Sequence, residues 1–416
     1  MVDNVQDDSH PDKPRKPTHV IGVGASAGGL EALQILFRRI PANLDAAFVV
    51  VQHLSPDFPS LMDELLSRSS NLKIEKARDG VELEANRIYL NQPGQLLRVV
   101  ENSLVMTPAP PGHRLLLPID ELFKSLAHSH ENRAAGVVLS GSGSDGSRGI
   151  MALREVGALV LVQNPDEAQF DGMPKNAIDT GIVDQVLPLR ELAETLISYI
   201  THSVVKRHDR DFRLYLSERP QALEQVLSKI SKQTGLDFRA YKESTIARRI
   251  QHRMGITNMR ELEDYGDYIA ENPDEIDMVR RDLLIGVTQF FRDADVWEML
   301  KAETILPLIQ QVKEGDTIRV WCAGCSSGEE AYTLGILFLE AMRKLDVNHS
   351  VKIFASDVDQ SAISIGAAGV YPANISAEVP PELLDRYFNP VQGSSYQVSP
   401  ELRSLVVFAC HNLIED

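Results

Sequence analysis

A short stretch near the beginning of the chain sets the fold class. An apolar run at residues 20–23 stops at a cluster of small residues at 24–29, and apolar side chains then recur at helical spacing from Leu30 to Ile40. A strand, a tight turn and a helix in that order place Ser26 at the carboxyl edge of a parallel sheet, where α/β proteins bind ligands. The glycines allow backbone angles that other residues resist, and the start of the helix offers free N–H groups to an anion.

Two interpretations of this stretch compete. Residues 22–27 also match the Gly-x-Gly-x-x-Gly/Ala fingerprint of dinucleotide-binding folds, which expects an acidic residue at the end of the next strand. The next expected strand, 47–52, is instead followed by His53. A histidine at one strand end beside a serine at the neighbouring strand end suits a nucleophile and its general base. The spacing therefore favours a nucleophile over a nucleotide site.

Composition limits the class of protein. The 416 residues are 43% hydrophobic and 24% charged, which is typical of a globular chain of two or three domains. The net charge of -17 argues against a nucleic-acid partner. Three cysteines indicate a reducing compartment, and no apolar run approaches the roughly 18–20 residues that span a bilayer. Residues 1–17 are polar and resemble no targeting peptide, so we expect a disordered tail on a cytoplasmic protein that is not membrane-embedded.

Residues 18–202 alternate between short β-rich runs and helical patterns, which predicts an α/β fold with a doubly wound parallel sheet. A small hairpin is expected at 98–105. The expected strands are 20–24, 47–52, 87–90, 136–139, 158–162 and 182–186, and the expected helices are 28–40, 59–69, 119–130, 147–155 and 189–199.

A second Gly/Ser-rich turn follows the expected strand 136–139 and ends in Asp145. Ser26, His53 and Asp145 would therefore lie at one edge of one sheet, and they are the residue types of a serine hydrolase triad. Simpler interpretations exist for each residue: the turn is only a turn, the histidine is structural, and Asp145 caps the next helix. The coincidence of all three favours catalysis.

The motifs GASAGG, VVQHLSPDF, SGSGSDG and FDGMPKNAI together resemble the catalytic domain of the CheB family, the chemotaxis receptor methylesterases. The resemblance covers residues 18–202. It implies that Ser26 is the nucleophile, His53 the general base and Asp145 the orienting acid, with no cofactor. The implied substrate is a glutamate methyl ester on a chemoreceptor or a similar signalling protein, and some members also deamidate glutamine. The N–H groups of Ala27 and Ser142 are candidates for the oxyanion hole.

The chain departs from the family pattern in two places near this site. Ala27 stands where a threonine is common, and the acid loop reads Gly141-Ser142-Gly143 where Gly-Met-Gly is common. We also expect no receiver domain before the first strand, so control by an attached receiver would be absent. The partners expected are a methylated receptor, with a histidine kinase or a response regulator as further candidates.

Residues 203–220 combine high charge with weak periodicity, which predicts a linker with helical ends. Residues 221–286 are helical in pattern and contain a basic run with Arg248, Arg249 and Arg253. Such a run is usually a solvated face, but it can also contact an acidic surface on a partner.

The last part of the chain, 287–416, has the pattern of a nucleotide-binding half-sheet. An expected strand at 317–321 leads into a small-residue loop at 322–330, and the next strand, 351–355, is followed by Asp357. Asp357 thus follows the strand at whose end dinucleotide-binding folds carry the acid that binds the ribose hydroxyls. Cys322 and Cys325 also fit a redox Cys-x-x-Cys, but the small residues continue beyond them. A zinc site is disfavoured because no second such pair exists, and we expect no metal.

The motifs ARRIQHRM, TQFFRD, RVWCAGCSSGEEAYTL, ASDVDQSAISIGAAGVY and VVFACHNL resemble the CheR family, the receptor glutamate methyltransferases, over residues 221–416. The resemblance implies S-adenosylmethionine as methyl donor and a basic helix that touches the receptor's acidic methylation region through Arg248, Arg249 and Arg253. The implied residues of the donor pocket are Thr288, Arg292, Ala323, Gly324, Glu329, Asp357, Asn412 and Leu413.

The chain stops at Asp416, directly after its HNL motif, where family members continue. We therefore expect only the first half of a Rossmann-like methyltransferase sheet, with exposed apolar surface and weak or absent methyl transfer. The sequence thus predicts a receptor methylesterase fused to an incomplete methyltransferase. The alternative is a non-catalytic module that docks on receptors or kinases.

Overall fold

The computed structural model describes residues 15–54, 61–109, 117–207, 209–284, 286–313, 315–391 and 395–414. It divides into two compact units, Met1–Leu283 and Leu284–Asp416.

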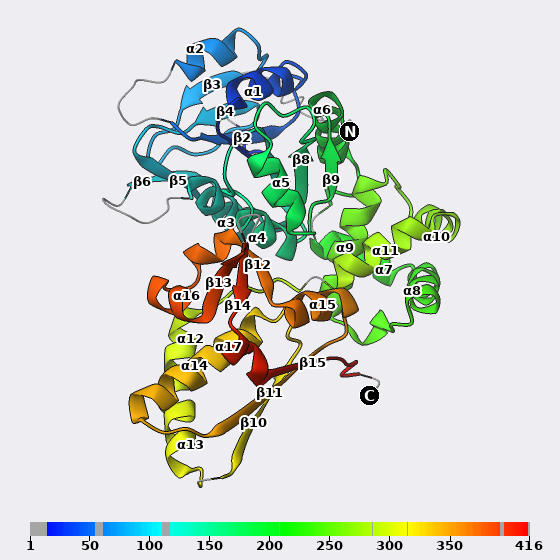
Figure 1. Cartoon of the computed structure of the whole chain (residues 1–416). Helices are drawn as coiled ribbons and strands as arrows, with labels where there is room; N and C mark the ends of the chain where they lie inside the picture. Colours follow the sequence, from blue (N-terminus) through cyan, green and yellow to red (C-terminus); the bar gives the residue numbers. More distant parts are fainter. Residues whose placement is uncertain are drawn as a thin grey trace. The chain divides into compact units, whose positions relative to one another are not determined.

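Unit 1 is built on a seven-stranded parallel sheet with the order β3-β4-β2-β1-β7-β8-β9 (Figure 1). The chain leaves β1 in one direction to reach β2 and returns to the other side of β1 with β7. The sheet therefore changes winding direction at β1, the place where open α/β sheets bind ligands. The strands are β1 (His19–Ala25), β2 (Ala46–Gln52), β3 (Lys73–Lys76), β4 (Arg87–Leu90), β7 (Ala134–Val138), β8 (Leu159–Gln163) and β9 (Gln185–Leu187).

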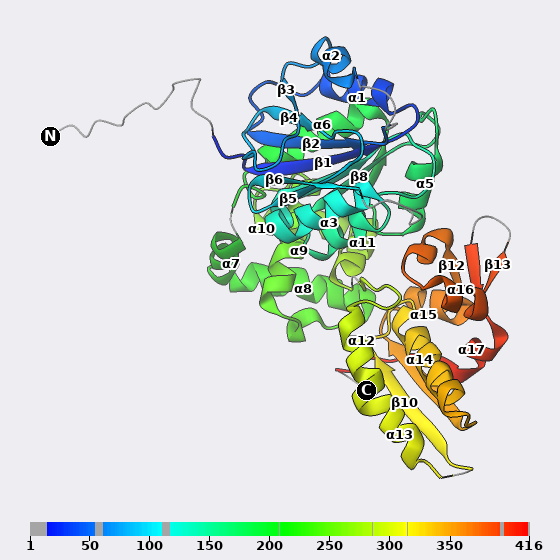
Figure 2. The ribbon, with the colours of Figure 1, turned by 90° about the vertical axis from the view of Figure 1, so that its left-hand side faces the viewer.

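Helices cover both faces of this sheet, because consecutive strand residues point to opposite sides. Ile21 and Val23 pack with α1 (Gly29–Phe37), α2 (Met62–Ser67) and α6 (Leu189–Thr201). Val20 packs with the opposite layer. That layer consists of α3 (Pro118–His130), α4 (Gly149–Glu155) and α5 (Gly172–Asp179). Figure 2 shows α1 and α3 on opposite sides of β1 and β2. The predicted doubly wound parallel sheet is confirmed.

The predicted hairpin is present as an antiparallel pair, β5 (Gln95–Val100) and β6 (Ser103–Pro108). It lies beside α3, where Val99 N–H donates to Ser125 Oγ at 2.9 Å. The rest of unit 1 is helical and matches the expected all-helical region. Its elements are α7 (Asp209–Ser217), α8 (Pro220–Thr234), a 3₁₀ turn (Phe238–Ala240), α9 (Glu243–Ile256), α10 (Leu262–Glu271) and α11 (Pro273–Leu283).

Unit 2 contains a three-stranded parallel sheet, β10 (Thr317–Ala323), β11 (Ser350–Asp357) and β15 (Val406–Cys410), in the order β10-β11-β15. An antiparallel sheet contains β12 (Val370–Pro372), β14 (Ser395–Val398) and β13 (Phe388–Val391). The helices are α12 (Ala294–Leu300), a π-helical turn (Lys301–Ile305), α13 (Leu306–Gln311), α14 (Glu329–Leu345), α15 (Gln360–Ala368), α16 (Pro381–Tyr387) and α17 (Pro400–Leu405), with a 3₁₀ turn at Ala373–Ala377.

The core of unit 2 lies on one face of the parallel sheet, where Ile318 and Ile353 pack against α14. The other face carries a row of exposed apolar side chains, because Trp321 pairs with Phe354 and Phe354 pairs with Val407. A parallel sheet normally has both faces covered. The predicted exposure of apolar surface is therefore present in the described part of this unit.

Several local expectations were wrong. Helix α5, which begins directly after Asp171, and the edge strand β3 are not among the expected elements. The expected linker contains α7, in which Phe212 is fully buried. The expected helix 59–69 is shorter, since α2 begins at Met62, and its first two positions lie outside the described residues, as do residues 1–14 of the expected tail.

Candidate active site

Ser26 lies in the turn between β1 and α1, at the change of winding direction. Its N–H donates to Ser140 O in the loop after β7, and its carbonyl accepts from Gly29 N–H, both at 3.0 Å. The turn requires the left-handed backbone of Gly28, whose φ is 72°. A side chain there would be strained and would meet Gln169 and Ser140. The turn thus fixes Ser26 against the neighbouring loop.

His53 connects Ser26 to Asp145. Its Nδ1 is 3.1 Å from Ser26 Oγ, and its Nε2 is 2.7 Å from Asp145 Oδ2. A carboxylate can only accept, so the ring proton of neutral His53 belongs on Nε2, and Nδ1 is left to accept from the serine hydroxyl. The backbone N–H of His53 donates to Ala25 O at 3.2 Å, which extends the pairing of β1 and β2 by one residue. The ring is therefore held between the two side chains.

Asp145 is buried, with 2% of its side chain exposed, whereas 35% of the His53 side chain is exposed. Its Oδ2 accepts from Ile119 N–H at 3.0 Å and its Oδ1 from Asp120 N–H at 2.9 Å, both in the first turn of α3. Both donors belong to the first turn of α3, where backbone N–H groups have no partner within the helix. The structure therefore brings together Ser26, His53 and Asp145 from the ends of three adjacent strands.

The loops around Ser26 are held by hydrogen bonds. Ser140 Oγ donates to Ala27 O at 2.9 Å and accepts from Phe170 N–H at 3.0 Å. Among the described residues, no backbone carbonyl accepts from the N–H of Ala27 or of Ser142. Both groups of the expected oxyanion hole therefore remain without a backbone acceptor.

Gly141 and Met173 are site residues that sequence reasoning did not single out. A Cβ atom at Gly141 would lie 2.2 Å from Met173 Sδ and 2.8 Å from Ser26 Cβ. Met173 N–H also donates to Gly141 O at 2.8 Å. Only a glycine allows the loop after β7 to approach the serine this closely. The signal was present in the Gly141-Ser142-Gly143 repeat, but its packing partner, Met173, lies in α5, a helix that was not among the expected ones.

Two open clefts meet at His53. One is lined by polar side chains that include Glu31, Gln34 and Gln169, together with Ser26. The other is lined by Leu54, Leu96 and the turn 91–95 beside β5. The serine is thus reachable from a broad surface, which suits a substrate side chain presented by a protein.

In unit 2, the expected donor pocket follows the carboxyl edge of the parallel sheet. Ala323 ends β10, and the left-handed Gly324 has no atom within 4 Å of the position of a Cβ. Asp357 ends β11, and its two oxygens accept from Ser326 N–H at 2.8 Å and Asp359 N–H at 2.9 Å. A carboxylate has about four acceptor positions, so Asp357 retains capacity for ribose hydroxyls. An open glycine backbone beside this acid fits a nucleoside.

Glu329 is the first residue of α14 and accepts from Ser327 Oγ at 2.7 Å. Burial of its carboxyl group raises the pKa of Glu329 to about 7, against which the Ser327 hydrogen bond acts. A half-buried carboxyl group near the loop 323–328 fits the cationic part of S-adenosylmethionine. These residues therefore fit the implied donor.

The remaining expected pocket residues lie at the same end of the unit. Ser326 Oγ donates to Gly286 O at 2.9 Å, which anchors the segment that continues to Thr288 and Arg292. Arg292 is exposed and its guanidinium donates to Val287 O. On the other side, His411 N–H donates to Asp357 O at 3.0 Å, so Asn412 and Leu413 directly follow a contact with β11.

The predicted receptor contact of the basic helix is wrong for two of its three arginines. Arg249 and Arg253, expected to contact a receptor, are only 6% and 3% exposed. Arg249 donates to Arg154 O at 2.6 Å, and Arg253 forms a buried ion pair with Glu275. Arg248 is half-buried. Tertiary contacts inside unit 1 take up two of the three guanidinium groups, because α9 packs between the esterase-like part and α11.

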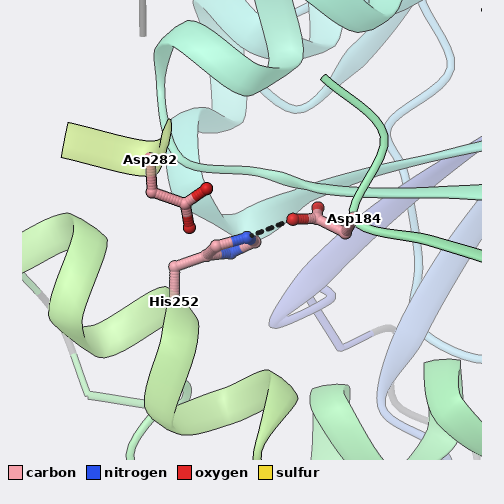
Figure 3. Close-up of side chains that lie close together, drawn as sticks. All are labelled: Asp184, His252 and Asp282. Atoms are coloured by element: carbon pink, nitrogen blue, oxygen red, sulfur yellow. Dashed lines mark hydrogen bonds and ion pairs between the residues drawn. The ribbon is translucent and has the colours of Figure 1, made fainter. Parts of the chain in front are cut away.

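Asp184, His252 and Asp282 form a buried cluster of the kind that can bind a metal ion (Figure 3). His252 Nε2 lies 2.9 Å from Asp184 Oδ1, and Arg154 forms ion pairs with both aspartates. Burial alone would raise the pKa of Asp184, but Arg154 and His252 outweigh it and lower that pKa below its usual range. Arg154 pairs with both carboxylates and Arg253 Nε lies 3.9 Å from Asp282 Oδ2, so this cluster is an ion-pair network that joins α4, α9 and α11.

Three family models match successive parts of the chain. The CheB methylesterase model matches residues 21–196, the model of the all-alpha domain of CheR methyltransferase matches 221–284, and the model of its SAM-binding domain matches 286–416. The chain joins a CheB methylesterase domain to the two domains of a CheR methyltransferase. The resemblance inferred from the motifs is thereby confirmed.

Two curated proteins are similar to parts of this chain. An uncharacterized 104.1 kDa protein in the hypE 3' region of Rhodobacter capsulatus is 36% identical over 85% of this chain and 39% of that protein. Protein-glutamate methylesterase/protein-glutamine glutaminase 1 of Xanthomonas campestris pv. campestris is 35% identical over 44% of this chain and 52% of its own length. The chain thus spans about half or less of these curated relatives.

The crystal structure of the Thermotoga maritima CheB methylesterase catalytic domain is 27% identical and covers 43% of this chain and 97% of that chain, with a TM-score of 0.40. No helix in the described part of our chain is both long and apolar enough to cross a membrane.

Proposed function

We propose that the CheB-like domain hydrolyses glutamate methyl esters by serine catalysis, with Ser26 as nucleophile, His53 as general base and Asp145 as the acid that orients it. The observation that carries the proposal is His53, whose two ring nitrogens lie within hydrogen-bond distance of Ser26 and Asp145 at adjacent strand ends. The exposed ring of His53 suits a base that contacts the substrate, and the burial of Asp145 suits a carboxylate that contacts only the base.

The reaction proceeds in two steps. Ser26 Oγ attacks the ester carbonyl while its proton moves to His53 Nδ1, and the imidazolium is stabilised by Asp145. His53 then returns the proton to the departing methoxide, which leaves as methanol. Water, activated by His53, attacks the acyl-enzyme and frees the glutamate carboxylate and Ser26. The N–H groups of Ala27 and Ser142 are the proposed donors to the oxyanion.

The proposed substrate is a methylated glutamate on a chemoreceptor or similar signalling protein, presented on a surface that reaches the two open clefts at His53. A histidine kinase or a response regulator is a further proposed partner. The proposed domain boundaries are 18–202 for the esterase, 221–286 for the helical domain and 287–416 for the donor-binding domain.

For the CheR-like part, we propose that Asp357 binds the ribose of S-adenosylmethionine, that Ala323 and Gly324 line its pocket and that Glu329 faces its cationic part. Thr288 and Arg292 would lie near the methionine moiety, and Asn412 and Leu413 would flank the adenine. The donor supplies an activated methyl group on a sulfonium. The protein mainly positions a glutamate carboxylate in line with that methyl group.

Methanol release from methylated receptor membranes tests the esterase. Ser26→Ala should abolish release, whereas Ser67→Ala, which changes a serine of α2 outside the site, should leave it unchanged. Equal rates in the wild type and Ser26→Ala would remove Ser26 as the nucleophile. No release from any variant, on membranes that another esterase demethylates, would favour a docking module.

Calorimetry with S-adenosylmethionine tests the second domain. Binding that is lost in Asp357→Asn and retained in Asp346→Asn, which changes the acid after α14, would support the proposed pocket. No heat at millimolar donor would show that the CheR-like part does not bind it.

A further inference from the structure

The carboxylate of Asp120 lies directly behind the proposed catalytic acid. Asp120 is the third residue of α3 and is only 1% exposed. Its backbone N–H donates to Asp145 Oδ1 at 2.9 Å. Asp145 in turn belongs to the loop between β7 and α4. The two acids therefore meet where the N-terminal ends of α3 and α4 come together.

Each acid accepts hydrogen bonds from backbone N–H groups at the start of the helix to which the other acid's segment leads or belongs: Asp145 at the start of α3, and Asp120 at the start of α4. Asp145, from the loop before α4, accepts from Ile119 and Asp120 N–H in α3. Asp120, from α3, accepts with Oδ1 from Arg148 N–H at 3.0 Å and from Gly149 N–H at 2.6 Å at the start of α4. Helix starts leave such N–H groups without partners in the helix itself. This exchange fixes the acid loop to α3 at both ends.

Glycines bring the two helix starts close enough for this exchange. A Cβ at Gly149 would lie 2.9 Å from Asp120 Cα and 2.6 Å from Phe123 Cβ. A Cβ at Gly24 would lie 2.4 Å from Ile119 Cγ2, so β1 also needs a residue without a side chain where α3 begins. The sequence therefore provides room for a contact that serves Asp145.

Burial and the neighbouring Asp145 raise the pKa of Asp120 to about 7, against the Gly149 hydrogen bond and the charges of Lys124 and Arg148. Oδ2 of Asp120 has no hydrogen-bond partner among the described residues. The charged and titratable groups that face it are Asp145, Lys124 and Arg148, with His53 beyond Asp145. The charge behind Asp145 therefore changes near neutral pH.

We propose that Asp120 is a positioning residue of the esterase: its carboxylate holds the acid loop against α3, which keeps Asp145 aimed at His53 and adds negative charge behind that pair. The inference rests on the proposed serine esterase. It assigns to Asp120 no contact with the substrate.

Two variants separate the two parts of this role. Asp120→Ala removes the acceptor for Arg148 and Gly149, and we expect kcat to fall about tenfold or more with KM within about twofold, because the misplaced acid affects the chemical step. Asp120→Asn keeps an acceptor oxygen and removes the charge. Without that charge His53 becomes a weaker base, so the acid limb of the pH profile should move to lower pH by roughly half a unit.

The experiment measures methanol release over pH 5–9 with the whole chain, together with the circular dichroism spectrum of each variant. Asp237→Ala, which removes a similar acceptor for Arg239 N–H in the helical domain, is the control and should match the wild type. If Asp120→Ala fails to fold, the pH limb of Asp120→Asn decides. An unshifted limb in Asp120→Asn, or wild-type kcat in a folded Asp120→Ala, would overturn the proposal while leaving the esterase intact. Absence of release that depends on Ser26 in the wild type would overturn both.

Discussion

At the scale of single residues, Gly141 shows how closely the esterase site is packed. Gly141→Ala should lower kcat for methanol release by about tenfold or more, because the added Cβ meets Ser26 Cβ and displaces the nucleophile. The double variant Gly141→Ala/Met173→Ala is the comparison to make, since it removes the collision with Met173 Sδ and leaves the collision with Ser26. A low rate in both variants supports a direct effect on the serine.

A rate restored by the double variant would show that Gly141→Ala acts through Met173 alone. Met173→Ala by itself gives the baseline, because a truncated buried methionine costs about 2–5 kcal/mol of stability.

Glu329 provides a test of the proposed donor pocket. A cation bound beside it should favour its ionised form, so donor binding near pH 6.5 should release a proton, and this release should vanish by pH 8.5, where the carboxyl group with a pKa of about 7 is already ionised. Calorimetry in two buffers of different ionisation enthalpy measures the proton. Glu329→Gln should bind more weakly without releasing it, and Glu382→Gln, an exposed acid of α16, should behave as the wild type. Undiminished proton release in Glu329→Gln would exclude this role.

At the scale of elements, the network around Arg154 joins the esterase part to the helical domain within unit 1. Arg154→Met removes the cation that Asp184 and Asp282 share in a buried site, and we expect a loss of about 3–5 kcal/mol. Hydrogen exchange should accelerate in α9 and α11. Arg98→Met breaks the more exposed pair with Glu121, for which about 0–1 kcal/mol is expected. Equal protection of α9 and α11 in the wild type and Arg154→Met would contradict the proposed junction.

This network also shows what the sequence leaves open. The sheet and the site edge were predictable, because alternating strands and helices imply parallel pairing, and the carboxyl ends of parallel strands then meet wherever their order falls. The burial of Arg249 and Arg253 could not be predicted, since a basic helix has the same sequence pattern whether its partners are solvent, a receptor or Glu275. Burial of charge depends on contacts distant in sequence.

The missed elements have local reasons. β3 reads Lys-Ile-Glu-Lys and gains its strand structure from pairing with β4 at the edge of the sheet. The start of α5 contains Gly172 and Pro174, which are typical of turns, although Pro is tolerated in the first turn of a helix. Helix α7 lies in a charged segment, and the burial of Phe212, Tyr215 and Leu216 distinguishes it from a linker.

At the scale of the whole molecule, the two units should respond differently to acid. Burial, followed by the charge of Arg133, lowers the pKa values of His19 and His130 in unit 1 to about 4. A histidine with a lowered pKa contributes stability above pH 6.5 that is lost as pH falls towards 4, on the order of 2–3 kcal/mol each. In unit 2, the raised pKa of Glu329 acts in the opposite sense, because its contribution is complete below about pH 4.5 and is lost as pH rises through 7.

Tryptophan fluorescence separates the two units, because the chain has two tryptophans, Trp297 and Trp321, and both belong to unit 2. Far-UV circular dichroism reports on both. The dichroism change that fluorescence does not follow reports the unfolding of unit 1. On lowering the pH from 7 to 5, we expect the urea midpoint of that change to fall, while the midpoint measured by fluorescence changes little or rises. His19→Asn/His130→Asn should reduce the fall, since asparagine does not titrate. Midpoints that fall in parallel by both probes would contradict independent acid responses, and they would mean that the two units unfold as one because each is stabilised by the other.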